Sequence, residues 1–373
     1  MKVGIFTLPL ENNYGGVLQA YALSEFLKSI GHEVYLIDSN NKAEVSQLKY
    51  SARIIKRIIK RYVLGNNIEI FSERRKKNEV SVVNINFIHF IKKHFPNQWF
   101  LDNNLELITN LDAIVVGSDQ IWRPKYYYKI ENAFLSFLEH SSKVKRIAYA
   151  PSFGTDKCEY ADIQKLMCSQ LLSKFDAISV REDSAVNMVE DFFGQKAQHV
   201  LDPTMIVDLD VYTRLFKGKK EKYNGKGITY ILDSSSDKLA VVNKVSELLG
   251  FEFVAVNEVK GDWKTPSTER VLPSIEEWLQ GFYESDYVIT DSFHACVFAI
   301  LFNKPFIVYG NIDRGSSRFL SLLKMFDLED RLIFDFKALS DNIIYSDINW
   351  NSVQGILIQN RLKSQYFLSE ALS

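Results

Sequence analysis

Short apolar runs alternate along the chain with longer segments in which apolar residues recur every three or four positions. Short apolar runs are typical of strands buried in a parallel sheet, and the longer repeats are typical of helices that cover such a sheet. This alternation predicts an α/β protein. The predicted strands are 2–8, 32–38, 112–116, 146–150, 176–180, 199–201, 228–232, 251–256, 287–290 and 305–309, and the predicted helices include 17–30, 238–249, 275–283 and 295–302.

The length of the chain predicts two such domains. A domain usually has roughly 100–200 residues, and this chain has 373. The polar, glycine-containing stretch 217–227 has the composition of a linker or loop. We expect two doubly wound, Rossmann-like domains that face each other across a cleft, residues 1–206 in the first and 207–345 in the second. Residues 346–373 are expected to form a helix that packs back on the first domain.

One predicted strand–helix–strand unit, 287–309, carries the most informative polar residues. Asp291, Ser292 and His294 form a polar corner between its first strand and its helix. Open α/β sheets bind ligands at such carboxyl ends of strands, and the free N–H groups of a helix N-terminus favour an anion. A histidine at this point can exchange protons near neutral pH. Two interpretations fit: a catalytic corner that binds an anion, or a helix cap beside a structural imidazole.

Two other predicted strand ends carry residues that suit a ligand. The turn at 11–16 contains a glycine pair, which either lets the backbone approach an anion or serves only the turn itself. The segment 118–122 combines a carboxylate, an amide and an indole, which is a typical sugar-binding set, although a simple helix cap also fits. Asp119 is the carboxylate of this set. The candidate substrate-binding residues here are Asn13, Tyr14, Gly15, Gly16, Ser118, Gln120 and Trp122.

Three arginines are candidates for binding an anionic group. Arg181 lies at a predicted strand-to-helix turn, and Arg314 and Arg318 follow the strand 305–309. The planar guanidinium fork matches a phosphate or a carboxylate with two parallel hydrogen bonds. The competing interpretation for Arg181 is a structural ion pair with a nearby acid.

The segment 51–64 is an amphipathic helix by its pattern. Its apolar half contains Ile54, Ile55, Ile58, Ile59, Tyr62 and Val63, and its basic half contains Arg53, Lys56, Arg57, Lys60 and Arg61. Either the apolar half faces a core and the basic half faces water, or the helix lies on an anionic lipid surface.

Composition narrows the functional classes. The formal net charge is −1, so no overall field attracts nucleic acid. Three cysteines without a pair motif, no signal-peptide pattern and no bilayer-length apolar run predict a cytoplasmic protein. The sequence has no Walker A motif, no G-x-G-x-x-G and no metal-spaced His/Cys cluster, so we expect neither a metal nor another cofactor.

Five motifs, taken together and in this order, carry a family resemblance. They are Asn13–Leu23 (NYGGVLQAYAL), Gly117–Gln120 (GSDQ), Ser179–Glu182 (SVRE), Asp202-Pro203, and Asp291–His294 (DSFH) with Asn303–Pro305 (NKP). This set resembles the polysaccharide pyruvyl transferases over about residues 1–330.

The resemblance implies a glycosyltransferase-B-like (GT-B) fold with the acceptor on the first domain and the donor on the second. It also implies transfer of the enolpyruvyl group of phosphoenolpyruvate to a sugar of a polysaccharide repeat unit or its lipid-linked precursor. The products are a pyruvate ketal and phosphate, and phosphoenolpyruvate is a co-substrate. By motif, His294 matches the proposed general acid, Arg181 matches the donor-binding arginine, and Gln19 joins the substrate-binding set. For the chemistry that the resemblance implies, Asp119 is the candidate for receiving the acceptor proton or orienting the acceptor sugar.

One departure from the family pattern concerns the donor. Many members have an arginine two residues before the histidine, and this chain has Ser292. Either Ser292 and the helix N-terminus hold the anion, or Arg314 or Arg318 supplies the charge.

Two other classes of function stay open from the sequence. A GT-B-type glycosyltransferase that uses a nucleotide sugar would have the same fold, and fold alone does not decide function. A non-catalytic scaffold in polysaccharide assembly would use the amphipathic helix for peripheral contact with the inner membrane, without turnover.

Overall fold

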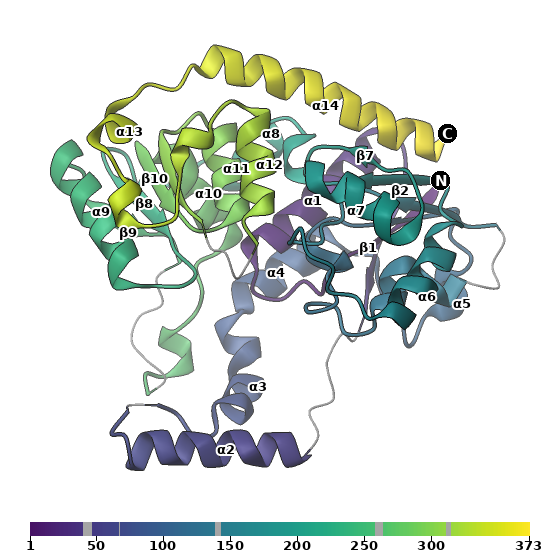
Figure 1. Cartoon of the computed structure of the whole chain (residues 1–373), viewed down its shortest axis with the longest axis horizontal. Coiled ribbons are helices and arrows are strands. Elements are labelled where there is room, and N and C mark those ends of the chain that lie inside the picture. The colour runs from purple at the N-terminus through teal and green to yellow at the C-terminus, as the bar shows by residue number, and fades with distance from the viewer. Residues whose placement is uncertain (40–46, 67, 139–142, 258–263, 311–314) are drawn as a thin grey trace.

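The computed structural model describes residues 1–39, 47–66, 68–138, 143–257, 264–310 and 315–373. Two parallel β-sheets with flanking helices form the body of the molecule (Figure 1). The last strand of the first sheet ends at His199, and the first strand of the second sheet begins at Gly227. This architecture confirms the predicted fold class of two doubly wound α/β units. The predicted boundary after residue 206 falls between the two sheets.

Among the described residues, the first sheet has seven parallel strands in the order β3–β2–β1–β4–β5–β6–β7. Val3 of β1 pairs with Val34 of β2 on one side and with Ala113 of β4 on the other. The direction of winding reverses between β1 and β4, so the crevice at their carboxyl ends is the expected ligand position. The strands are β1 Lys2–Phe6, β2 Glu33–Asp38, β3 Gln98–Phe100, β4 Ala113–Val116, β5 Lys145–Ala148, β6 Ala177–Val180 and β7 Gln198–His199.

In the part of the chain that the structure describes, the second sheet has five parallel strands in the order β12–β11–β10–β8–β9. Ile289 of β10 pairs with Thr229 of β8 and with Ile307 of β11. Its winding reverses between β8 and β10, which places the corner after β10 at the second expected ligand crevice. The strands are β8 Gly227–Tyr230, β9 Phe253–Ala255, β10 Tyr287–Thr290, β11 Phe306–Tyr309 and β12 Leu332–Ile333.

The helices agree with the apolar repeats, with shifted ends. The first helix begins at Tyr14 rather than at residue 17, so Gly15 and Gly16 lie in its first turn and not in a loop. The helices of the body are α1 Tyr14–Ser29, α4 Ile85–His94, α5 Leu105–Ile108, α6 Asp162–Leu172, α7 Asp183–Phe193, α8 Asp210–Phe216, α9 Ser236–Leu249, α10 Ile275–Glu284, α11 Phe293–Leu301, α12 Ser317–Met325, α13 Asp341–Tyr345 and α14 Trp350–Leu372.

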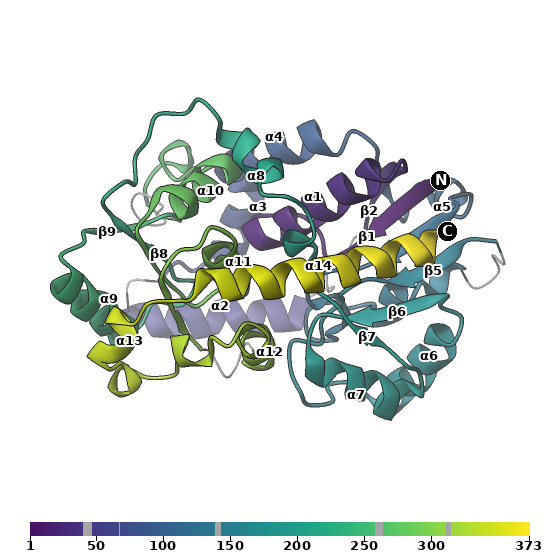
Figure 2. The same ribbon diagram turned by 90° about the horizontal axis from the view of Figure 1, so that it is seen from above.

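The C-terminal helix α14 runs from the second sheet back across the first (Figure 2). The hydroxyl of Ser364 accepts a hydrogen bond from the Leu201 N–H at 2.9 Å. Arg361 Nε donates to the Met205 carbonyl at 2.8 Å, and Gln365 Nε2 donates to the Ile206 carbonyl at 2.7 Å. These bonds fix α14 to the segment that follows the last strand of the first sheet.

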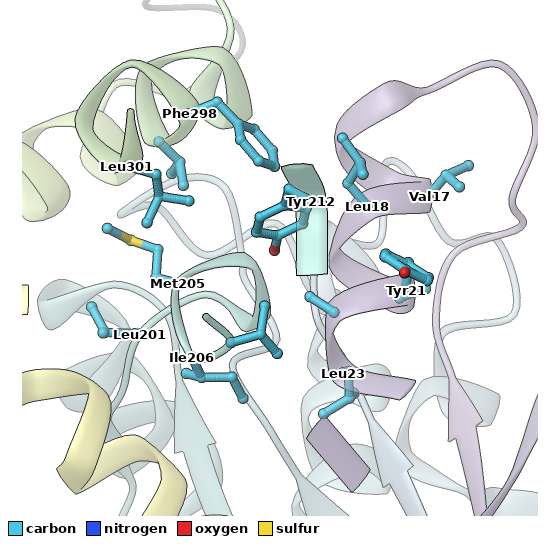
Figure 3. Close-up of a cluster of buried hydrophobic side chains, with 14 of the residues drawn as sticks. Val17, Leu18, Tyr21, Leu23, Leu201, Met205, Ile206, Tyr212, Phe298 and Leu301 are labelled. Atoms are coloured by element: carbon cyan, nitrogen blue, oxygen red, sulfur yellow. The ribbon is translucent and has the colours of Figure 1, made fainter. Parts of the chain in front are cut away.

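The two α/β units share one apolar core where α1, α8 and α11 meet (Figure 3). Leu18 of α1 and Tyr212 of α8 are fully buried there, as is Phe298 of α11. The rings of Tyr212 and Phe298 meet edge to face with their centres 5.0 Å apart. Close packing of this kind stabilises the contact between the units and sets the distance between the N-termini of α1 and α11.

The amphipathic segment forms α2, Gln47–Tyr62, which lies outside the body and is joined to it by α3, Ser72–Val83 (Figure 1). Ile55, Ile59 and Tyr62 are exposed to solvent. The core-facing interpretation of this helix is therefore wrong. Within the described ranges, no helix has both the length and the apolar character needed to cross a bilayer.

Candidate active site

The candidate site lies where the N-terminus of α1 meets the N-terminus of α11. His294 is the second residue of α11, and Gly15 is the second residue of α1. A Cβ atom added to Gly15 would lie 2.0 Å from Nδ1 of His294, a distance that no real side chain tolerates. The absent side chain of Gly15 therefore admits the imidazole ring.

Asp202 connects the imidazole to the first unit. Its Oδ2 lies 3.5 Å from His294 Nε2 and accepts a hydrogen bond from Arg181 Nη1 at 2.8 Å. Its Oδ1 accepts hydrogen bonds from the N–H and the hydroxyl of Thr204 at 3.0 and 2.7 Å. Burial alone would raise the pKa of Asp202, but His294, Arg181 and Thr204 hold that pKa below its ordinary value. Asp202 is thus a buried carboxylate beside the histidine.

The Asp202-Pro203 motif is part of the family resemblance, but the sequence predicted no role for Asp202 in the site. A signal was present, because an Asp-Pro-Thr sequence directly follows a predicted strand. An aspartate at such a point commonly caps the next turn, and Asp202 does cap the turn at Thr204. Capping alone was therefore enough to explain an aspartate at this position. Only the fold shows that the second carboxylate oxygen of Asp202 faces His294.

Arg181, the residue after β6, is held by two carboxylates. Besides Asp202, its guanidinium lies 3.4 Å from Asp119 Oδ1. Its central carbon is 4.5 Å from the centre of the Phe293 ring, which belongs to the second unit. Burial opposes the charge, but Asp202 and Asp119 raise the pKa of Arg181 above its ordinary value. Arg181 therefore forms the ion pairs that one interpretation predicted, and it forms them within the cluster that surrounds His294.

Arg318 brings a second buried guanidinium to the same aromatic ring. It is the second residue of α12, and its guanidinium carbon is 5.7 Å from the centre of the Phe293 ring. Burial, and then the charge of Arg181, lower the pKa of Arg318 to about 10, while Asp119 and Glu182 partly oppose that shift. The two neighbouring buried cations repel each other, and the acids around them offset part of that repulsion.

The remaining donor candidates are placed differently. Ser292 is the N-cap of α11 and is buried beside His294. Asp291 points into the second unit, where Lys238 Nζ donates to it at 2.7 Å and the N–H of Leu232 donates at 2.7 Å. Asp291 therefore holds the loop after β8, and its assignment as a donor contact stays a prediction. Arg314 lies outside the described residues.

Two members of the substrate-binding set hold the loops of the first crevice together. Gln19 Oε1 accepts a hydrogen bond from the Ser118 N–H at 2.9 Å, and Gln19 Nε2 donates to the Thr7 hydroxyl at 3.0 Å. The Ser118 hydroxyl donates to the Ala150 carbonyl at 2.7 Å and lies 3.3 Å from Asp202. Both side chains are fully buried. They position the loop that carries Asp119.

Two aromatic members of that set belong to the core. Trp122 is fully buried, and its Nε1 donates to the Ala133 carbonyl at 3.1 Å. Tyr14 stacks on Trp278 with 5.3 Å between ring centres, and its hydroxyl donates to the Pro273 carbonyl at 2.7 Å. Neither ring presents a face to solvent, so the assignment of these two residues as sugar contacts is corrected.

The last two members of that set lie at the edges of the same loops. Gln120 Oε1 accepts from Arg123 Nη1 at 3.1 Å. Asn13 is the N-cap of α1, is exposed, and has its side chain next to Gly16. Of these two, Asn13 has the side chain that a ligand reaches from solvent.

The sequence did not predict an open cavity of about 800 Å³ that the structure contains. It lies at the carboxyl ends of β1, β2 and β3, and its polar lining includes Asp38, Ser39, Asp102 and Asn103. Tyr126 also lines it and contributes to the electrostatic surroundings of Arg318. The signal was weak, because the short strand β3 was not predicted. The cavity has the size and polar lining of a small-molecule site on the first unit.

The fold of this chain is similar to that of solved glycosyltransferases. Arabidopsis thaliana UGT89C1, solved with UDP-L-rhamnose, superposes with a TM-score of 0.54 at 9% identity over 100% of this chain and 99% of that one. A glycotransferase of kitacinnamycin superposes with a TM-score of 0.50 at 8% identity over 100% and 99% of the two chains. At such low identity these likenesses show the GT-B fold and nothing about the substrate.

The family follows from the sequence match. Residues 13–314 match the family model described as polysaccharide pyruvyl transferase, a range that includes Gly15, Asp119, Arg181, Asp202 and His294. The chain therefore belongs to the polysaccharide pyruvyl transferase family. It is also 22% identical over 246 residues to General stress protein 30 of Bacillus subtilis (strain 168), covering 60% of this chain and 67% of that protein.

Proposed function

We propose that this transferase moves the enolpyruvyl group of phosphoenolpyruvate onto a sugar and closes a pyruvate ketal across two hydroxyl groups. The acceptor is a polysaccharide repeat unit or its lipid-linked precursor. The methylene carbon of the donor takes a proton and becomes a methyl group, two C–O bonds to the sugar form, and the bond to phosphate breaks. One hydroxyl proton of the sugar accounts for the new methyl hydrogen, and the other leaves with phosphate.

The observation that supports this proposal is the buried cluster of His294, Asp202, Arg181 and Arg318 between the two units. Phosphoenolpyruvate is a small, highly charged anion, and fixed cations in a site of low dielectric bind such a group strongly. The pair of guanidiniums around Phe293 supplies that charge. Arg318 therefore takes the place of the family arginine that is Ser292 in this chain.

His294 is assigned as the general acid that protonates the donor carbon. Asp202 orients the ring and balances its charge when the ring carries a proton. A positioned acid contributes on the order of 10²–10⁴-fold to such a step. Gly15 faces one ring nitrogen and Asp202 faces the other, so both nitrogens lie within the contact between α1, α11 and the segment after β7.

The acceptor is assigned to the first unit. Asp119 lies at the carboxyl end of β4, next to Arg181, and is the group that takes up the acceptor proton or orients the acceptor. The cavity at the ends of β1, β2 and β3 contributes carboxylate, amide and hydroxyl groups, which are the usual partners of sugar hydroxyls. No metal or other cofactor is assigned to this reaction.

The experiment that tests the proposal follows phosphate release from phosphoenolpyruvate. Phosphate release that depends on a repeat-unit oligosaccharide, with one pyruvate ketal gained by that sugar, is the expected result. A nucleotide-sugar glycosyltransferase would instead release a nucleoside diphosphate from a nucleotide sugar and leave phosphoenolpyruvate unchanged. A non-catalytic scaffold would consume neither donor.

A further inference from the structure

Helix α2 exposes an apolar stripe to water. Ile55, Ile58, Ile59 and Tyr62 recur at helical spacing, and Ile55 and Tyr62 are 57% and 72% exposed. The next two residues, 63 and 64, are also apolar and exposed. Single exposed apolar residues are common on protein surfaces, but a contiguous group on one helix marks an interaction surface.

A row of basic side chains accompanies this stripe on the same helix. Arg53, Lys56 and Lys60 are exposed and are spaced so that they share one face. Two other basic residues of α2 point back to the protein instead: Arg57 Nη2 donates to Glu73 Oε1 at 2.7 Å, and Arg61 Nη1 donates to the Ile68 carbonyl at 3.4 Å. The exposed surface of α2 therefore combines apolar and basic side chains.

Ion pairs fix α3, the helix that carries α2. Arg75 of α3 bonds to Glu69 at 2.8 Å and to Glu79 at 2.5 Å. Glu79 also pairs with Arg270 of the second unit at 2.7 Å. The Leu272 N–H of that unit donates to the Val83 carbonyl at 3.0 Å, where α3 ends. These bonds hold α2 at a fixed place away from the body, on the side opposite α14 (Figure 1).

We propose that α2 docks the protein on the surface of an anionic lipid bilayer, with its apolar stripe in the headgroup region and its basic row near lipid phosphates. An interfacial helix needs an apolar face and a basic polar face, both open to the surroundings, and α2 has both. The exposed cations of α2 favour an anionic surface as the occupant. This docking goes beyond the proposed transfer reaction and does not depend on it.

Co-sedimentation of the purified full chain with vesicles tests the docking. Vesicles of phosphatidylglycerol mixed with phosphatidylcholine should carry the protein down at low salt, and vesicles of phosphatidylcholine alone should not. The double variant Ile58→Asp/Ile59→Asp removes the apolar stripe, and the triple variant Arg53→Glu/Lys56→Glu/Lys60→Glu reverses the basic row. Each should weaken binding by at least about tenfold, the triple variant because each basic residue contributes separately near an anionic surface.

A matched control uses another exposed apolar residue on another helix. Leu362 of α14 is 61% exposed, so Leu362→Asp adds a charge at a comparable surface position and should leave vesicle binding unchanged. Unaltered folding of all variants is checked by thermal melting. Equal binding of the Ile58→Asp/Ile59→Asp variant, or a failure of the unaltered protein to bind phosphatidylglycerol vesicles, overturns the proposal. The proposal is also overturned, in favour of a second copy as the occupant, if the unaltered protein self-associates without lipid and the Ile58→Asp/Ile59→Asp variant does not.

Discussion

The cluster around His294 and the surface of α2 depart from the usual distribution of side chains in opposite ways. Arg181, Arg318 and Asp202 are charged groups buried between the two units, whereas Ile55 and Tyr62 are apolar groups left in water. Ordinary packing places charges outside and large apolar side chains inside. Each region therefore carries a local cost, because the stripe of α2 stays in water and burial beside Arg181 disfavours the charged form of Arg318.

The nature of each cost indicates the kind of partner that offsets it. Buried cations beside each other are stabilised by a small anion that enters the site. An exposed apolar stripe with basic neighbours is stabilised by a surface that is apolar inside and anionic outside. The chemistry and the docking of this protein are therefore separable, because they use residues in different parts of the structure. Variants of the cluster should change the reaction, and variants of α2 and its support should change the docking.

Replacing the histidine should have the largest effect. His294→Gln should lower turnover by at least about a hundredfold, because a positioned acid contributes that much or more. Steady-state rates of phosphate release measure it. His89→Gln, at an exposed position on α4, is the matched control and should keep full activity. A folded His294→Gln protein with nearly normal turnover would show that the acid lies elsewhere.

The contact between the two helix N-termini gives a second, purely steric prediction. Gly15→Ala places a methyl group where His294 Nδ1 lies, so the ring must leave its present position beside Asp202 and turnover should fall strongly. At the neighbouring Gly16, an added Cβ meets only the Asn13 side chain at 3.1 Å, and that side chain is exposed. Gly16→Ala should therefore cost much less. Equal rates for the two variants would contradict the packing of His294 against α1.

Changes in the donor arginines should affect the KM for phosphoenolpyruvate. Arg181→Lys keeps the charge but loses the fork that bonds Asp202, so KM should rise even in this mild variant. Arg318→Ala should raise KM by about tenfold or more, the size expected for losing a hydrogen bond to a charged group. The double variant Arg318→Ala/Ser292→Arg should recover part of that loss. No recovery, together with an unchanged KM for Arg318→Ala, would move the compensating charge to another residue.

The smallest effect concerns the support of α2 at low pH. The bond from Arg57 lowers the pKa of Glu73 from its ordinary 4.5 to about 2. Because this pKa is depressed on folding, the pair stabilises α2 above about pH 4.5, and that contribution is lost as the pH falls toward 2. Both side chains are partly exposed, so the contribution is at most about 1 kcal/mol.

Amide hydrogen exchange in α2 measures that effect. Exchange in the unaltered protein should become faster between pH 4.5 and pH 2, after correction for the intrinsic pH dependence of exchange, because Glu73 takes up a proton in that interval. Glu73→Gln should show fast exchange at every pH in that interval. Identical corrected profiles for the two proteins would mean that the Arg57–Glu73 pair does not hold α2.

The fold was predictable because its strands are buried on both faces. In β10, all four residues are buried, and a short, mostly apolar run such as 287–290 is typical of a strand inside a parallel sheet. The ends of helices were less predictable. Tyr14, Gly15 and Gly16 look like a turn in sequence, since two glycines rarely favour a helix. In the structure Tyr14 stacks on Trp278 and Gly15 packs against His294, and these residues form the first turn of α1.

The candidate site was predictable only in part, because a strand end identifies a residue and not the direction of its side chain. Asp291 and His294 lie in the same corner, but Asp291 turns toward Lys238 and His294 turns toward Asp202. Trp122 follows a strand end as well, yet its ring fills the core. The pairing of His294 with Asp202 joins residues from two different units, and no local pattern reports such a contact.

The central claim is that the buried cluster binds phosphoenolpyruvate. Calorimetric titration of the unaltered protein and of Arg318→Ala with phosphoenolpyruvate tests this claim most directly, because binding of the donor can be measured without an acceptor. The claim predicts saturable binding of one phosphoenolpyruvate per chain, weakened by about tenfold or more in Arg318→Ala because a charged hydrogen-bonding partner is lost. Absence of binding to the unaltered, folded protein, together with saturable binding of a nucleotide sugar that Arg318→Ala weakens, would contradict it.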